Sequence, residues 1–190
     1  MTYTTNEKII IGLIGEKLAG KDEVAKYLVA KYGAFHIKFS HLLDEVLEVL
    51  DLPKTRRNEI DLGLGLRQIF GNEVLYKALK KRIEHLNNPV IVINGIRMDE
   101  FERVVGDLKA QTLYITAPLE IRYQRYLERH EKIDDGKLNF EEFARQDKEE
   151  LTERDIPVLG KRADYKIDNV GSLVDLHKKV DDIFNHSVIS

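Results

Sequence analysis

A glycine-rich loop between an apolar run and an amphipathic segment most strongly constrains what this chain can fold into. The run at 8–14 is apolar and β-branched, and the sequence GEKLAGKD follows it at 15–22. Behind the loop, Val24, Leu28 and Tyr32 recur at four-residue spacing. A short apolar run bounded by glycine predicts a strand buried on both faces, and the spacing predicts a helix. This unit opens an α/β fold with a parallel sheet.

The loop matches the pattern G-x-x-x-x-G-K, whose glycines allow backbone N–H groups to point inward at a phosphate. The following helix presents its positive N-terminus, and Lys21 is placed to reach the β- and γ-phosphates of a nucleotide. The alternative is a glycine turn with a solvated lysine. The sequence therefore predicts a nucleotide-binding site, with these contact residues: Gly15, Lys17, Ala19, Gly20, Lys21, Asp22 and Glu23.

Asp22 stands where the usual pattern has Ser or Thr. The hydroxyl normally binds Mg²⁺, whereas a carboxylate adds a negative charge close to the phosphates, which a metal would offset. We expect Asp22 to hold Mg²⁺ directly or through water, because Mg²⁺ prefers oxygen ligands. The alternative is that Asp22 only caps the helix.

Strand-like runs recur along the chain and alternate with helix-like segments, at 35–39, 90–93, 113–115 and 165–167. This alternation predicts a five-stranded, doubly wound parallel sheet within one domain, residues 1–190. Two segments depart from it. Residues 52–88 carry only helix-like patterns and predict a helical insertion, and the densely charged residues 128–160 predict a flap over the site.

Composition limits the partners of the chain. Its 30 Lys+Arg and 33 Asp+Glu give a net charge of −3, so no general basic field favours nucleic acid or an anionic membrane. The chain has no cysteine, which excludes a disulfide framework and a thiolate metal site. We expect a cytoplasmic protein without a membrane span or signal peptide, monomeric or homodimeric, that binds a nucleotide and a small phosphorylated acceptor.

Several motifs together resemble the nucleoside monophosphate kinase-like branch of the P-loop kinases, especially phage-type deoxynucleoside monophosphate kinases and dephospho-CoA kinases. They are GKD at 20–22, LRQIFGNE at 66–73, INGIR at 93–97, RQD at 145–147, ADY at 163–165 and DNVGS at 168–172. The resemblance implies a three-layer α/β P-loop kinase fold, in which 52–88 bind the acceptor and 128–160 form a lid. It also implies that ATP and Mg²⁺ are the cofactors.

The resemblance assigns roles to residues outside the loop. Arg67 and Arg97 would bind the acceptor phosphate, and Asn169 and Gly171 would contact the adenine of ATP. For Arg97 the alternative is a salt bridge with a neighbouring acidic residue, Asp99 or Glu100.

Arg122, Arg125 and Arg129 are spaced to share one helical face, from which they could line the site over the phosphates. Because phosphoryl transfer is catalysed mainly by positioning and positive charge, we expect Arg125 and Arg129 to act in catalysis with Lys21. The alternative is a solvated, charge-rich helix.

The chain departs from the family pattern after the second strand. Dephospho-CoA kinases carry a catalytic aspartate there, but this chain reads KFSH at 38–41, and Ser40 is left as an acceptor contact. Transfer to a phosphate oxygen needs no base, because that acceptor is already ionised. A (deoxy)nucleoside monophosphate is therefore the expected acceptor. Dephospho-CoA or another phosphorylated metabolite is the alternative within the class.

A second departure lies at the end of the third strand, where Asn94 replaces a frequent aspartate; Asp22 would compensate for its loss. Together with the missing catalytic aspartate, Asp22 and Asn94 leave an alternative of another class. This is a non-catalytic nucleotide-binding switch or sensor.

Overall fold

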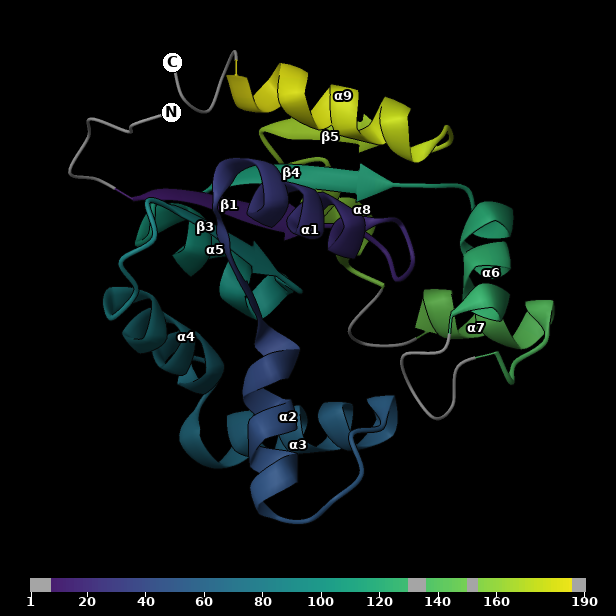
Figure 1. The fold of residues 1–190 in the computed structure, drawn as a ribbon. Helices are drawn as coiled ribbons and strands as arrows, with labels where there is room; N and C mark the ends of the chain where they lie inside the picture. The colour runs from purple at the N-terminus through teal and green to yellow at the C-terminus, as the bar shows by residue number, and fades with distance from the viewer. Residues whose placement is uncertain (1–7, 130–135, 150–153, 186–190) are drawn as a thin grey trace.

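A computed structural model describes residues 8–129, 136–149 and 154–185, and its centre is a five-stranded sheet (Figure 1). The strands are β1 (Ile9–Ile14), β2 (Phe35–Lys38), β3 (Val90–Asn94), β4 (Gln111–Thr116) and β5 (Tyr165–Asp168), in the order β2-β3-β1-β4-β5. All neighbouring strands are parallel. The predicted doubly wound sheet is confirmed.

Helices cover both faces of the sheet, which makes three layers. On one face lie α1 (Lys21–Tyr32) and α9 (Leu173–Ile183), which share a core with β1, β4 and β5. The other face is covered by α2 (Phe39–Val49), α4 (Val74–Glu84), α5 (Met98–Gly106) and α8 (Ile156–Gly160). Because β1 and β3 are enclosed between the layers, their sequences are apolar runs rather than alternating ones.

Two helix ends are set by local chemistry. Gly33 ends α1 with a positive φ of 66°, a conformation that favours glycine. Ser172 begins α9 in a reciprocal capping box with Asp175. The buried face of α9 is formed by Leu176 and Val180, whereas Leu173 in its first turn is 55% exposed.

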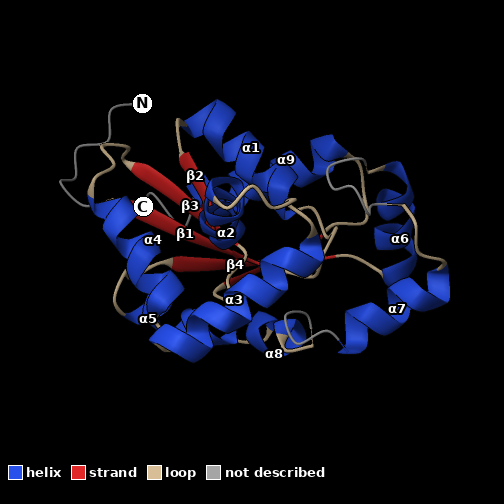
Figure 2. Ribbon diagram, turned by 90° about the horizontal axis from the view of Figure 1, so that it is seen from below, coloured by secondary structure: helices blue, strands red, loops and turns tan. Residues whose placement is uncertain are grey.

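The segment 52–88 contains only helices among its described elements, α3 (Arg56–Phe70) and α4, as expected. Figure 2 shows α3 beside α2, and the two helices contact each other. Within the insertion, α3 therefore packs on α2, whereas α4 covers a face of the sheet.

The charged segment begins after α6 (Leu119–Glu128), which projects from the end of β4 and packs against α7 (Phe140–Glu149) (Figure 1). Asn139 and Glu142 exchange hydrogen bonds of 2.9 Å at the start of α7 and so form a capping box. In the last part of 128–160, α8 buries Ile156 and Leu159 against the sheet. Of the described elements of this segment, α7 stands away from the sheet and α8 belongs to the core (Figure 1).

None of the described helices is long and apolar enough to span a membrane.

Candidate active site

The glycine-rich loop lies between the carboxyl end of β1 and the start of α1, in the middle of the sheet. Strand β1 lies between β3 and β4, so the strand order reverses direction at β1. In open α/β sheets, ligands bind outside the carboxyl ends of the strands at such a switch point. The fold therefore places residues 15–22 where this architecture binds ligands.

Two glycines of the loop are required by its close approach to neighbouring chain segments. Gly15 has φ 154°, and a Cβ atom there would lie 2.1 Å from the carbonyl oxygen of Ile115. Gly20 has φ 111°, and its Cβ would lie 2.3 Å from Nδ2 of Asn169. Leu18 also adopts a positive φ of 63°, which is strained for a residue with a side chain. Such strain clusters at ligand sites, and no residue pattern in the loop predicts it.

The side chain of Lys21 folds back onto the start of the glycine-rich loop. Its Nζ atom donates hydrogen bonds of 2.7 Å to the carbonyl oxygens of Gly15 and Glu16. The positive charge is therefore held at the centre of the loop, beside the N-terminus of α1. An anion entering the loop meets this charge and the helix dipole together.

Asp22 makes contacts that bring together two strand ends. Its Oδ1 atom accepts a hydrogen bond of 2.8 Å from the amide of Asn94 and lies 2.7 Å from Nζ of Lys38. Burial alone would raise the pKa of Asp22, but Lys38, with smaller contributions from Lys21 and Arg129, lowers it. Asp22 is therefore ionised at neutral pH.

Asp22 fits a divalent cation. Mg²⁺ is commonly bound by one or two carboxylates together with phosphate oxygens and water. The Asp22 side chain is 38% exposed at the mouth of the loop, so phosphates in the loop and its carboxylate could share one ion. Among the described residues, no cluster of three or more His, Asp or Glu side chains could hold a metal. A cation at Asp22 would therefore need phosphate oxygens or water as its other ligands.

Arg125 joins the loop to the segment after β5. Its guanidinium donates to the carbonyl oxygens of Leu18 and Ala19 at 3.1 and 3.2 Å and to that of Asn169 at 3.1 Å. Burial lowers the pKa of Arg125. Arg129 follows the last residue of α6, and its charge contributes to the low pKa of Asp22. The structure thus brings both predicted catalytic arginines to the loop.

Arg122, the third arginine of the predicted helical face, also reaches the loop, but its main partner lies on another helix. Its buried guanidinium forms a bidentate ion pair with Asp147 of α7, at 2.6 and 2.7 Å. Its Nε atom donates a hydrogen bond to the carbonyl oxygen of Ala117. Arg122 also donates to the carbonyl oxygen of Lys17 at 3.5 Å. Its role is to fix α7 to α6.

Replacing Asp147 with Asn tests this role. The amide keeps the shape but loses the charge that pairs with buried Arg122, so we expect a loss of about 2 kcal/mol in the free energy of unfolding. Urea denaturation measures it. Asp61→Asn is the matched control, because Asp61 pairs with Arg57 at 2.7 Å where both side chains are exposed, and we expect less than about 0.5 kcal/mol. Equal losses would contradict the role.

Lys17 and Glu23 direct their side chains away from the loop. The Nζ atom of Lys17 donates to Gln146 at 3.2 Å and lies 4.3 Å from the ring centre of Phe143, both on α7. Glu23 pairs with Lys26 on the surface of α1. A nucleotide contact of either residue would be made by its backbone N–H group.

The predicted acceptor residues occupy the end of the sheet formed by β2 and β3. Arg97 precedes α5 at the carboxyl end of β3, and Ser40 lies in the first turn of α2. Arg67 of α3 is paired with Glu100 of α5, whose carboxylate is 1% exposed. Glu100 therefore fixes Arg67, whereas the sequence had suggested it as a partner of Arg97.

Asn169 and Gly171 lie on the opposite side of the loop, after β5. Nδ2 of Asn169 donates to the carbonyl oxygen of Ala19 at 2.8 Å. A Cβ atom on Gly171 would lie 2.8 Å from Oδ2 of Asp175, so this glycine allows the turn into α9. An open hollow of about 390 Å³ lies beside them, and Thr116, Lys166, Asp168 and Val170 are among its lining residues.

Sequence analysis missed two further groups at the loop. Glu16 is buried, and its Oε1 atom accepts a hydrogen bond of 2.5 Å from Tyr114 of β4. Burial and this hydrogen bond raise the pKa of Tyr114 to about 12. The second is Lys38, whose place at the carboxyl end of a strand was a usable signal. Nothing in the sequence indicates that Glu16 turns inward.

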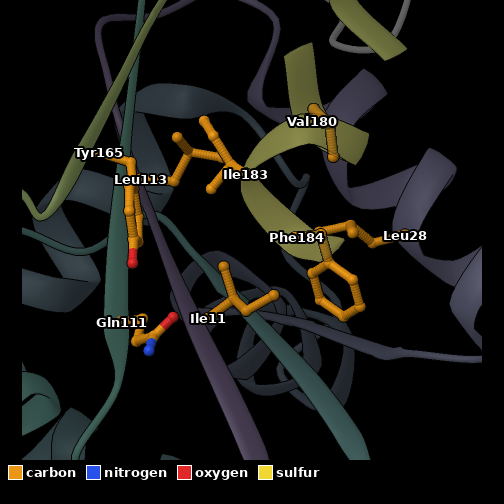
Figure 3. A pocket seen from close by; sticks show the side chains of 8 residues that line it. All are labelled: Ile11, Leu28, Gln111, Leu113, Tyr165, Val180, Ile183 and Phe184. Carbon is orange, nitrogen blue, oxygen red and sulfur yellow. The ribbon is translucent and has the colours of Figure 1, made fainter. Parts of the chain in front are cut away.

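A second, apolar pocket lies far from this edge, between the sheet and the helices α1 and α9 (Figure 3). Leu28, Leu113 and Phe184 are among its lining side chains, and its volume is about 10 Å³. This space holds at most one water molecule. It is a packing gap of the core rather than a ligand site.

Comparisons with known proteins agree with this architecture. The structure superposes on TT1252 from Thermus thermophilus with a TM-score of 0.66 and 22% identity, over 96% of this chain and 99% of the other. It also superposes on a shikimate kinase from Acinetobacter baumannii, solved with shikimate, with a TM-score of 0.61 and 17% identity, over 95% and 96% of the two chains. These similarities show the α/β fold of the P-loop kinases.

Proteins found by sequence comparison have a higher identity to this chain than these two solved structures. No family model matches the sequence. UPF0200 proteins of Saccharolobus islandicus and Saccharolobus solfataricus are each 30% identical to it over 190 residues, which cover 96% of this chain and 96% of each relative. The chain belongs to the UPF0200 protein family.

Proposed function

We propose that this protein is an ATP-dependent kinase that transfers the γ-phosphate of Mg²⁺-ATP to the phosphate group of a (deoxy)nucleoside monophosphate. The observation that carries the proposal is the convergence of Lys21 and Arg125 on one glycine-rich loop, close to which Arg129 follows α6. Charge spread over a transferring phosphoryl group is stabilised by cations held in such positions. The kinase fold supports the same class of reaction.

In this reaction an acceptor phosphate oxygen bonds to the γ-phosphorus, and the bond to the bridging oxygen breaks to release ADP. Lys21 leaves the loop carbonyl oxygens and neutralises the β- and γ-phosphates, while Arg129 faces the transferred group. Arg125 holds the donor side of the loop against Asn169. When bound, Mg²⁺ held by Asp22 would supply further neutralisation of the phosphate charge.

The acceptor is proposed from the chemistry at the end of β2. A hydroxyl acceptor needs a base whose pKa is near the working pH. The segment 38–41 offers no carboxylate, and Asp22 has a lowered pKa because it pairs with Lys38. A phosphate acceptor needs no base, and Arg97 lies at the adjacent strand end, where it could bind that acceptor.

ADP release from Mg²⁺-ATP, measured against a panel of ribo- and deoxynucleoside monophosphates, dephospho-CoA and shikimate, tests the proposal. We expect turnover with one nucleoside monophosphate, and Arg97→Met should raise its KM about tenfold or more because a charged hydrogen bond to phosphate is lost. Arg57→Met is the control, since Arg57 is 81% exposed and pairs with Asp61.

The other outcomes of this panel each contradict a different part of the proposal. Turnover only with shikimate or dephospho-CoA would retain the kinase and replace the acceptor. Tight ATP binding without transfer to any acceptor would favour the nucleotide-binding switch.

A further inference from the structure

The ion pair between Asp22 and Lys38 joins the nucleotide loop to the far side of the sheet. Lys38 is the last residue of β2 and is in register with Asn94 of β3. The ammonium of Lys38 and the amide of Asn94 both contact Oδ1 of Asp22, at 2.7 and 2.8 Å. The Lys38 side chain is 18% exposed, so this is a partly buried pair rather than a surface one.

The two histidines beside Lys38 add no positive charge next to Asp22. His36 and His41 flank it on β2 and α2. Burial, and next the charge of Lys38, lower the pKa of His36 to about 4, and the same two causes lower the pKa of His41. Both imidazoles are therefore uncharged at neutral pH, and the positive charge in contact with Asp22 is that of Lys38.

The charge of Asp22 matters because of its position. Asp22 directly follows Lys21 in the first turn of α1, where the helix N-terminus attracts the phosphates of a nucleotide. A carboxylate without a counter-ion at this point would repel those phosphates at short range. In the pattern's usual form a neutral hydroxyl occupies this position, and no such repulsion arises.

We propose that Lys38 is a built-in counter-ion of the nucleotide site. Its ammonium neutralises Asp22 while no divalent cation is bound, and it competes with such a cation for the same carboxylate. The protein then binds a nucleoside diphosphate without metal almost as tightly as with it. This inference rests on the proposed function for the identity of the anion.

Calorimetric titration of the full chain with ADP, in excess EDTA and in MgCl₂, tests the inference without relying on catalysis. We expect Lys38→Met to weaken ADP binding about tenfold in EDTA and less than about threefold in MgCl₂, because only the metal-free site depends on the lysine to neutralise Asp22. Lys26→Met is the matched control. Lys26 pairs with Glu23 at the same 2.7 Å on the same helix as Asp22, but it is 71% exposed.

A second substitution identifies Asp22 as the group through which Lys38 acts. Asp22→Asn removes the repelling charge, so the double variant Lys38→Met/Asp22→Asn should recover most of the ADP affinity in EDTA. Asp22→Asn alone should bind ADP in EDTA at least as tightly as the unmodified protein. This single variant keeps the inference testable if Lys38→Met does not fold, which circular dichroism would reveal.

An equal loss of ADP affinity with and without MgCl₂ in Lys38→Met would overturn the inference, and so would weaker metal-free binding by Asp22→Asn. Both results would leave the proposed kinase intact, provided that the unmodified protein binds ADP. Failure of the unmodified protein to bind ADP in MgCl₂ would overturn the inference and the proposed function together.

Discussion

Lys21→Ala is expected to lower kcat for phosphoryl transfer about a thousandfold while the protein stays folded. The Nζ atom of Lys21 donates to two carbonyl oxygens of its own loop, and Lys21 is not part of the buried apolar core, so we expect the fold to survive its removal. Its charge would be used on the transferring phosphate, and removal of one such group from a preorganised site costs roughly a hundredfold to a thousandfold in kcat. ADP release with the preferred acceptor measures this loss.

The control for this variant is Lys26→Ala, which removes a lysine from the exposed side of the same helix. We expect its kcat to stay within about twofold of the unmodified protein, since exposed ion pairs contribute little. If Lys21→Ala retained normal turnover, the loop would not be the site of the chemistry, and the proposed kinase would have to be abandoned.

Gly15→Ala is expected to lower the free energy of unfolding by about 4 kcal/mol. The new Cβ atom would lie 2.1 Å from the backbone oxygen of Ile115, at a φ of 154° that side chains rarely adopt. Backbone strain and overpacking each cost roughly 1–3 kcal/mol, and β4 cannot move away without disturbing the centre of the sheet. The midpoint of urea denaturation measures the loss.

Gly65→Ala is the matched control for this prediction. Gly65 lies within α3, and a Cβ atom there would meet nothing within 4 Å. Alanine is favoured over glycine inside a helix by about 1 kcal/mol, so this variant should be as stable as the unmodified protein or more so. Equal denaturation midpoints for the two variants would show that Gly15 is not packed against the backbone of β4.

The elements of the fold could be predicted because they depend on local patterns. The apolar run before Gly15 and the stripe of Val24, Leu28 and Tyr32 specify a buried strand and a helix without further information. Capping by Asn139 and Ser172 is equally local, because the partner of each lies three residues away.

The candidate site was predictable only in part, for a physical reason. The glycine-rich loop is continuous in the sequence, so its glycines and Lys21 could be identified from spacing. The partners of Arg122 and Arg67 could not, because Asp147 and Glu100 come from other helices. An arginine in a charge-rich segment can form a buried ion pair or face the phosphates, and its neighbours in the sequence do not distinguish the two.

The sequence by itself determined the order of strands and helices along the chain, the loop at 15–22 and the charge that Lys21 brings to it. Only the tertiary structure decided that Lys38 and Asn94 meet at Asp22. This meeting requires β2 to lie beside β3, although the chain between them runs through three helices. Strand order is set by how apolar faces pack over the whole sheet, and no local pattern of residues encodes it.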